Sequence, residues 1–240
     1  MALTLTVLGC SGSYPGEGNA CSGYLVGDGT TLVWVDAGSG TLANLQRHVG
    51  FADVDAVVLS HEHPDHWTDL EGFHIVLQHA APRHDVPVYA PAGLRDRTYQ
   101  TPEPEFAWHE VGDADRVTVG SLELSFSRTD HGPETLAVRV DGGGRSIGYS
   151  ADTGPCWSFG ALGSGLDLAL CEATVPAELE GQMQHLSARQ AGEAARAGRA
   201  RRLLLTHLWP TVDPERSRRD ASDAFGSVVD VAAMHQRYEV

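Results

Sequence analysis

Four potential metal ligands lie within six consecutive residues, in the segment His-Glu-His-Pro-Asp-His at positions 61–66. His61 and His63 stand two positions apart. Because alternate side chains of an extended backbone point to the same side, both imidazoles can reach one ion. Asp65 and His66 follow a proline at the start of an expected helix, which turns them toward a second ion. Ordinary packing does not require this density of ligands, so the spacing predicts a site for two metal ions.

The elements on either side of this segment are expected to position it. The apolar run at residues 55–60 predicts a short buried strand, so the ligands begin where a strand ends. A helix is expected directly after them, at residues 67–79. An isolated histidine is usually an ordinary polar or surface residue, and six are assigned to that group: His48, His74, His79, His84, His109 and His235.

Composition indicates a globular protein with a large core, because 42% of the 240 residues are hydrophobic and 20% are charged. No apolar run reaches the roughly 18 residues of a membrane span, so no membrane association is expected and a cytoplasmic location is predicted. Four cysteines form no Cys-x-x-Cys pair and are expected to be free, mostly buried thiols: Cys10, Cys21, Cys156 and Cys171.

Charge argues against an extended nucleic-acid partner. The formal net charge is −15, which repels a phosphate backbone at long range. All 17 basic residues are arginines, and eight of them lie between positions 189 and 219. A solvated helix surface is the favoured interpretation of that cluster, and an anion-binding patch is the alternative.

The remaining sequence predicts two half-chains, each with several strands and helices. Strands are expected at residues 3–7, 22–26, 31–35, 86–89, 106–110, 116–119, 122–128, 135–140, 145–149, 167–171 and 202–206. Besides the one already described, helices are expected at residues 40–49, 92–99, 188–198 and 214–224.

Two further features have open interpretations. The glycine-rich segment at residues 9–16 follows the first strand but matches no dinucleotide or Walker consensus, so it is expected to lie beside the mouth of the site. Direct contact with a phosphate is its less favoured role. Asp36 ends the hairpin of the next two strands and either orients a metal-binding histidine or simply forms a turn.

A two-metal site needs ligands from elsewhere in the chain, and three candidates follow predicted strands. His131 comes after the strand at 122–128, Asp152 after that at 145–149 and His207 after that at 202–206. Each of them alone would be weak evidence, because polar residues are common in loops. Together with the cluster at 61–66 they complete a dinuclear site.

The order His-x-His-x-Asp-His, His, Asp, His resembles the signature of the metallo-β-lactamase-fold hydrolases, and it spans nearly the whole chain. The resemblance implies one α/β domain over residues 1–240, a four-layer αβ/βα sandwich with the metals at one edge of its two sheets. It implies that two Zn²⁺ ions bind, with Mn²⁺ as an alternative. His63 stands where flavodiiron relatives carry an acidic residue, which favours hydrolysis over redox chemistry. The implied ligands are His61, His63 and His131 for one ion, Asp65, His66 and His207 for the other, and Asp152 as the bridge.

Three segments narrow the resemblance to the phosphodiesterase branch that contains ribonuclease Z: Tyr-Ser-Ala-Asp-Thr at 149–153, His-Leu-Ser at 185–187 and Leu-Leu-Leu-Thr-His at 203–207. By this likeness His185 is assigned as a general acid and Asp65 joins it in the catalytic set. The alternative for His185 is a helix cap without chemistry. Glu62 is not expected to act, because in extended backbone it faces away from its two histidine neighbours.

The substrate is expected to be small. Ribonuclease Z carries a tRNA-gripping arm between the ligands that correspond to His131 and Asp152, which here stand only 21 positions apart. The overall likeness is to compact actinobacterial cyclic nucleotide phosphodiesterases, so a cyclic nucleotide such as cAMP, attacked by a metal-bound hydroxide, is predicted. The likeness also implies a homodimer. The alternatives are a lactone or thioester hydrolase, a tRNA-processing endonuclease, and a metal-binding module without activity.

Overall fold

A computed structural model of the chain describes residues 2–99 and 104–240. Seven strands of this described part form the first sheet: β1 (Thr4–Gly9), β2 (Gly23–Gly27), β3 (Leu32–Ala37), β4 (Ala56–Val58), β5 (Val86–Ala90), β6 (Phe106–Glu110) and β14 (Arg237–Glu239). Their spatial order is β14-β1-β2-β3-β4-β5-β6. Strands from β14 to β3 pair antiparallel, and strands from β3 to β6 run parallel.

The second sheet takes seven strands from the later part of the described chain: β7 (Arg116–Val119), β8 (Leu122–Arg128), β9 (Leu136–Gly142), β10 (Arg145–Tyr149), β11 (Leu168–Glu172), β12 (Leu203–Thr206) and β13 (Asp230–Val231). Their spatial order is β13-β12-β11-β10-β9-β8-β7. Strands β7 to β10 pair antiparallel and strands β10 to β13 run parallel. Each half of the chain thus supplies most of one mixed sheet.

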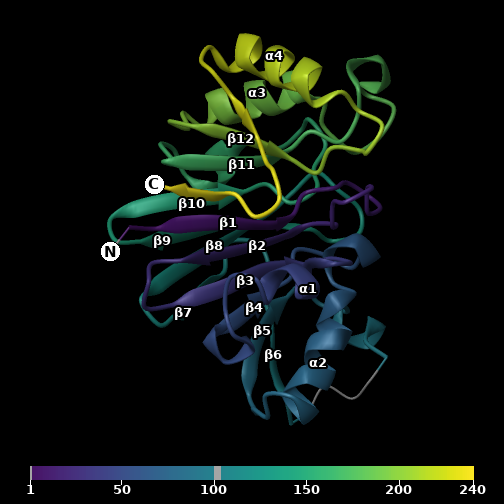
Figure 1. Cartoon of the computed structure of the whole chain (residues 1–240). Coiled ribbons are helices and arrows are strands. Elements are labelled where there is room, and N and C mark those ends of the chain that lie inside the picture. The colour runs from purple at the N-terminus through teal and green to yellow at the C-terminus, as the bar shows by residue number, and fades with distance from the viewer. Residues whose placement is uncertain (1, 100–103) are drawn as a thin grey trace.

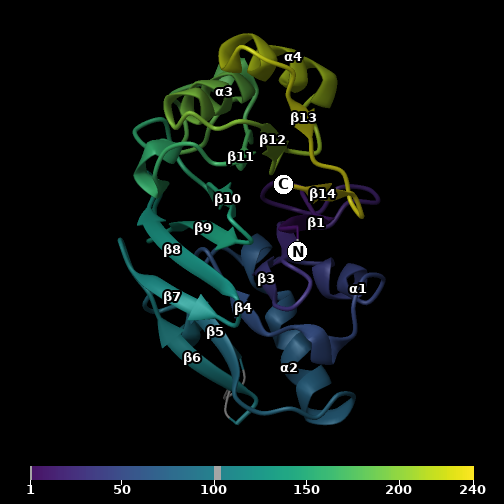
Figure 2. The same cartoon turned by 90° about the vertical axis from the view of Figure 1, so that its left-hand side faces the viewer.

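Helices cover the outer faces of both sheets (Figure 1 and Figure 2). The helices α1 (Thr41–Leu45) and α2 (Asp69–His79) lie outside the first sheet, and α3 (Ala188–Ala197) and α4 (Pro214–Phe225) lie outside the second. The order of layers is therefore helix, sheet, sheet, helix, which confirms the expected αβ/βα sandwich. None of the helices in the described part of the chain is long and apolar enough to cross a membrane.

Alternation along the strands explains why the layers stack. Leu5 and Val7 of β1 point into the core between the sheets, where they meet Tyr24 and Tyr149. Trp34 of β3 points the other way, into the core under α1 and α2. A third core, rich in alanine, lies between the second sheet and its two helices. The strands β3, β4, β11 and β12 are buried along nearly their whole length and are mostly apolar, whereas β7 and β8 leave polar residues exposed.

Most of the expected elements are present, with differences at short ones. The helix expected at 40–49 is α-helical only over Thr41–Leu45, and the one expected at 92–99 is reduced to a single turn at Arg95–Arg97, after Gly93 with φ +84°. The two C-terminal strands β13 and β14 were not predicted, because pairs and triplets of residues show no alternation. The four cysteines are free, and of these Cys156 is exposed.

Candidate metal centre

All seven expected ligands converge at the end of the sandwich where the parallel strands finish, the right-hand side in Figure 1. His61 follows β4, Asp152 follows β10 and His207 follows β12. Carboxyl ends of neighbouring parallel strands meet at one edge of a sheet, so residues far apart in sequence become neighbours. A single 3-10 turn at Pro64–His66, with the proline at its start, carries Asp65 and His66, and His63 directly precedes it.

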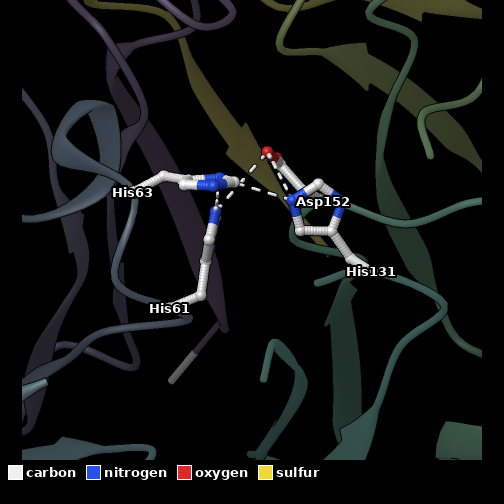
Figure 3. Close-up of side chains that lie close together, drawn as sticks. All are labelled: His61, His63, His131 and Asp152. Carbon is white, nitrogen blue, oxygen red and sulfur yellow. Dashed lines mark hydrogen bonds and ion pairs between the residues drawn. The ribbon is translucent and has the colours of Figure 1, made fainter. Parts of the chain in front are cut away.

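Three imidazoles and one carboxylate form the first group, and Figure 3 shows them pointing toward one another. His63 Nδ1 lies 3.0 Å from His61 Nε2 and 3.3 Å from His131 Nε2. Asp152 Oδ2 lies 3.6 Å from His61 Nε2 and 4.0 Å from His131 Nε2. Since the four potential donor atoms lie within 4.8 Å of one another, one metal ion could contact all of them.

A second group lies beside the first and shares Asp152 with it. His66 Nε2 lies 3.2 Å from His207 Nε2, and Asp65 Oδ2 lies 3.4 Å from the former and 3.1 Å from the latter. The other oxygen of Asp152, Oδ1, lies 3.3 Å from His66 Nε2 and 3.5 Å from His207 Nε2. The two oxygens of one carboxylate therefore face two separate groups of potential ligands.

Hydrogen bonds on the far side of the rings fix the tautomers of His61 and His66. A carboxylate only accepts hydrogen bonds, so His66 donates from Nδ1 to Asp36 Oδ2 at 2.7 Å. The Ser60 hydroxyl donates to the same oxygen at 2.9 Å, and it therefore accepts from Nδ1 of His61 at 3.0 Å. Tyr149 also donates to Asp36 at 2.9 Å. In their neutral forms, both rings keep an unprotonated Nε2 toward the centre.

The same reasoning applies to His131 and His207. His131 donates from Nδ1 to the carbonyl oxygen of Gln184 at 2.9 Å. The Thr174 hydroxyl donates to the Glu172 carboxylate at 2.5 Å and thus accepts from Nδ1 of His207 at 2.8 Å. Nε2 of all four rings therefore points into one small space. This convergence of imidazole nitrogens beside carboxylates fits divalent metal ions.

The carboxylates make the centre favourable for positive charge. Within the described part of the chain, Asp152 Oδ1 is one of four buried side-chain atoms without a hydrogen-bond partner. Coordination of a metal ion would compensate this oxygen for the missing hydrogen bond. Burial disfavours the charged form of His66, but Asp152, Asp65 and Asp36 outweigh burial and raise the pKa of His66 well above its usual value. Burial and the neighbouring His66 instead lower the pKa of His61.

His185 lies at the edge of this centre, with its ring centroid 5.1 Å from that of His131 and 5.9 Å from that of His207. Its Nδ1 donates to Glu172 Oε1 at 3.0 Å. Burial opposes the charge on His185, but the hydrogen bond and charge of Glu172 raise its pKa to about 9. His185 is therefore protonated near pH 7 and presents a second N–H group from Nε2. Ser187, not His185, caps α3.

Glu62 makes contacts away from the centre, in agreement with its expected orientation. Its two carboxylate oxygens accept from Nε and Nη2 of Arg97, each at 2.9 Å. The arginines between positions 189 and 219 also make ion pairs with carboxylates: Arg189 contacts Glu180 and Glu193, and Arg216 contacts Glu178. These pairs favour the solvated-surface interpretation of that cluster.

Sequence reasoning missed the residues that hold the ligands from behind, above all Glu172. Glu172 is fully buried, and its carboxylate accepts from the backbone amides of Thr153 and Leu186 in addition to His185. The signal for it was its position, because it directly follows the apolar run at 167–171, as the other site residues follow their strands. For Asp36 the orienting role was one of two open alternatives, and its contact with His66 favours that role.

The amino-acid sequence is similar to that of several known proteins. The family model described as a beta-lactamase superfamily domain matches residues 31–208. A protein of Mycobacterium tuberculosis named Rv1339 is 33% identical over 260 residues, which cover 100% of this chain and 93% of that protein. Ribonuclease Z of Mycobacterium bovis is 28% identical over 281 residues, with 99% of this chain and 98% of that protein covered.

A probable metallo-hydrolase of Bacillus subtilis, YhfI, is similar in both sequence and structure. It is 30% identical over 239 residues, which cover 96% of this chain and 97% of that protein. The crystal structure of YhfI, described as a metallo-beta-lactamase fold protein, superposes with a TM-score of 0.93 at 28% identity and full coverage of both chains. The similarity therefore extends over the whole sandwich.

Proposed function

The chain belongs to the beta-lactamase superfamily and is a metallo-hydrolase, and we propose that it hydrolyses a small phosphodiester, most specifically a cyclic nucleotide such as cAMP. The observation that carries this proposal is the position of His185, whose Nδ1 donates to the buried Glu172 carboxylate and whose ring lies beside those of His131 and His207. A phosphodiester with an alkoxide leaving group needs a proton donor at that place. A thioester hydrolase does not require one there, because a thiolate departs readily without a proton.

We assign the metal ligands as two sets that share a bridge. His61, His63 and His131 would hold one ion and Asp65, His66 and His207 the other, with Asp152 between the two sets. Imidazole-rich donor sets suit zinc, and the carboxylates also accommodate manganese, so two Zn²⁺ are proposed with Mn²⁺ as a substitute. When bound, such ions activate water for attack and neutralise charge on the phosphate oxygens.

The chain's own residues perform the remaining steps. As the water oxygen bonds to phosphorus and releases a proton to solvent, the ester P–O bond breaks and His185 transfers its Nε2 proton to the departing oxygen. Glu172 stabilises the imidazolium until then. Asp65, with its Oδ2 3.1 Å from His207 Nε2, is placed to orient the attacking water besides binding metal. Asp36 keeps Nδ1 of His66 protonated, so that Nε2 is available as a ligand.

Several features favour a small substrate over an extended nucleic acid. The chain from His131 to Asp152 contains only β9 and β10 with a tight turn between them, which leaves no room for an added arm. The net charge of −15 also disfavours long-range attraction of a polyanion. A homodimer and a cytoplasmic location remain predictions from the resemblance and from composition.

The role of His185 can be tested by varying the leaving group. The substitution His185→Ala is expected to lower turnover of cAMP by about a hundredfold or more, because its alkoxide leaves poorly without a proton. Turnover of bis(p-nitrophenyl) phosphate, whose leaving group needs no proton, should fall far less, and the metal content per chain should stay unchanged. Equal losses on both substrates would contradict the assignment of His185 as general acid.

A further inference from the structure

The glycine-rich loop between β1 and β2 lies directly against the end of β12 that carries His207. Ser11 and Leu208 form a parallel bridge, and the amide of Gly12 donates to the carbonyl oxygen of Leu208 at 2.9 Å. The next amide, that of Ser13, donates to Nε2 of His207 at 3.4 Å. This backbone N–H group therefore points at the same nitrogen that faces the metal centre.

The loop is built for this close approach. A Cβ atom on residue 12 would lie 2.3 Å from the carbonyl oxygen of His207, so only glycine fits there. Ser13 adopts φ +60°, a left-handed conformation that serine rarely takes. Two side chains hold it: the Trp209 indole donates to Ser13 Oγ at 2.9 Å, and the Ser11 hydroxyl donates to the carbonyl oxygen of Tyr14 at 2.7 Å. Strain of this kind persists only where surrounding contacts impose it.

The Ser13 N–H group loses its hydrogen-bond acceptor when a cation binds to His207. Nε2 of His207 has one lone pair, which serves either the amide proton or a metal ion. With that lone pair directed to a cation, the Ser13 N–H group loses its acceptor while the loop still holds it at the mouth of the site. A backbone N–H group there needs another acceptor, and an anionic oxygen is a strong one.

We infer that the Ser13 amide binds substrate: once the metal centre is loaded, its N–H group donates a hydrogen bond to a non-bridging phosphoryl oxygen. That the bound group is a phosphoryl group rests on the proposed function. The donor belongs to the backbone, so no side chain at position 13 signals it in the sequence. Gly12 permits the approach, and Trp209 acts as a positioning residue through its contact with Ser13 Oγ.

Nuclear magnetic resonance of the zinc-loaded protein tests this inference directly, with inorganic phosphate as the probe. Titration with phosphate should move the Ser13 amide proton downfield more than that of Glu17, which is exposed on the same loop. In parallel, the Ser13 backbone amide is replaced by an ester through incorporation of the corresponding α-hydroxy acid, with the same replacement at Glu17 as the matched control. The Ser13 ester should bind phosphate about ten- to a hundredfold more weakly than the Glu17 ester, at equal zinc content.

Two results would overturn the inference: an unshifted Ser13 amide proton, or equal phosphate affinity of the two esters. Failure of the zinc-loaded protein to bind phosphate would also overturn it. If the Ser13 ester does not fold or hold zinc, the titration of the unaltered protein decides alone. Turnover of cAMP by the unaltered protein is measured separately. Phosphate binding that depends on the Ser13 amide, without turnover of cAMP, would contradict the proposed function but support the Ser13 amide as an anion-binding donor.

Discussion

The buried carboxylate of Glu172 accepts a hydrogen bond from Nδ1 of His185 at 3.0 Å. Glu172 ends β11, whereas His185 lies in the loop before α3, and the pair connects that loop to the sheet. Through Thr174 the same carboxylate also reaches His207. One residue thus supports both the proposed proton donor and one of the proposed ligands.

The pH dependence of turnover follows from this pair. Glu172 raises the pKa of His185 to about 9, so the acid form predominates below that pH and is lost as the pH rises through it. Glu172→Gln removes the negative charge, and the pKa should fall toward the ordinary value of about 6.5. The loss of turnover on cAMP at alkaline pH should therefore begin at lower pH in the variant. Superimposable pH profiles of the variant and the unaltered protein would refute this role.

Asp36 should control metal affinity from behind His66. Asp36→Asn preserves the shape of the side chain but removes the carboxylate that accepts from Nδ1 of His66 at 2.7 Å. Zinc affinity, measured by competition with a chromogenic chelator, is expected to fall about ten- to a hundredfold. Asp55→Asn is the matched control, because Asp55 accepts from the amide of Leu32 on the same sheet and does not contact the centre. Equal zinc affinity of the two variants would argue against an orienting role for Asp36.

Removal of metal should lower the thermal stability of the protein. The convergent imidazoles and the buried carboxylate of Asp152 lose the cation that they bind, and a ligand at about 100 times its Kd contributes about 2.7 kcal/mol. For a chain of this size, Tm should fall by about 5–10 °C with a chelator and recover when zinc is added back. A Tm that responds to neither chelator nor zinc would mean that the cluster holds no structural cation.

Glu62 offers a negative control inside the ligand segment itself. It stands between His61 and His63 but pairs with Arg97, whose side chain is 59% exposed. Exposed ion pairs are screened by solvent and contribute little to stability, so Glu62→Gln should leave the free energy of unfolding nearly unchanged. Zinc content and turnover of cAMP should stay as in the unaltered protein. A large loss of turnover would show that Glu62 acts in the reaction after all.

The sequence predicted those parts of the centre that depend on local spacing. His61 to His66 could be recognised because their separations alone bring the side chains together. His131, Asp152 and His207 could be recognised because each follows an apolar strand, and strand ends meet at one edge of a sheet. The layer order was implied by the resemblance to the metallo-β-lactamase fold, and the succession of strands and helices in the two half-chains agreed with it.

The supporting contacts could not be predicted, because they join residues whose separation carries no pattern. Asp36 and His66 stand 30 positions apart, and only the sheet brings them together. The strand was expected to end at position 171, but β11 includes Glu172. The sequence therefore predicted a loop residue where the structure has a buried carboxylate. The Ser13 amide has no side-chain signal at all.

The most direct test of the central claim is hydrolysis of cAMP by the zinc-loaded protein, followed by ³¹P nuclear magnetic resonance. Opening of a lactone, followed by ¹H nuclear magnetic resonance, and cleavage of a tRNA precursor, followed by gel electrophoresis, are measured in parallel. We expect conversion of the cyclic diester signal to that of a phosphate monoester, with slower or no reaction of the lactone and the tRNA precursor. An unchanged diester signal together with rapid opening of the lactone would contradict it.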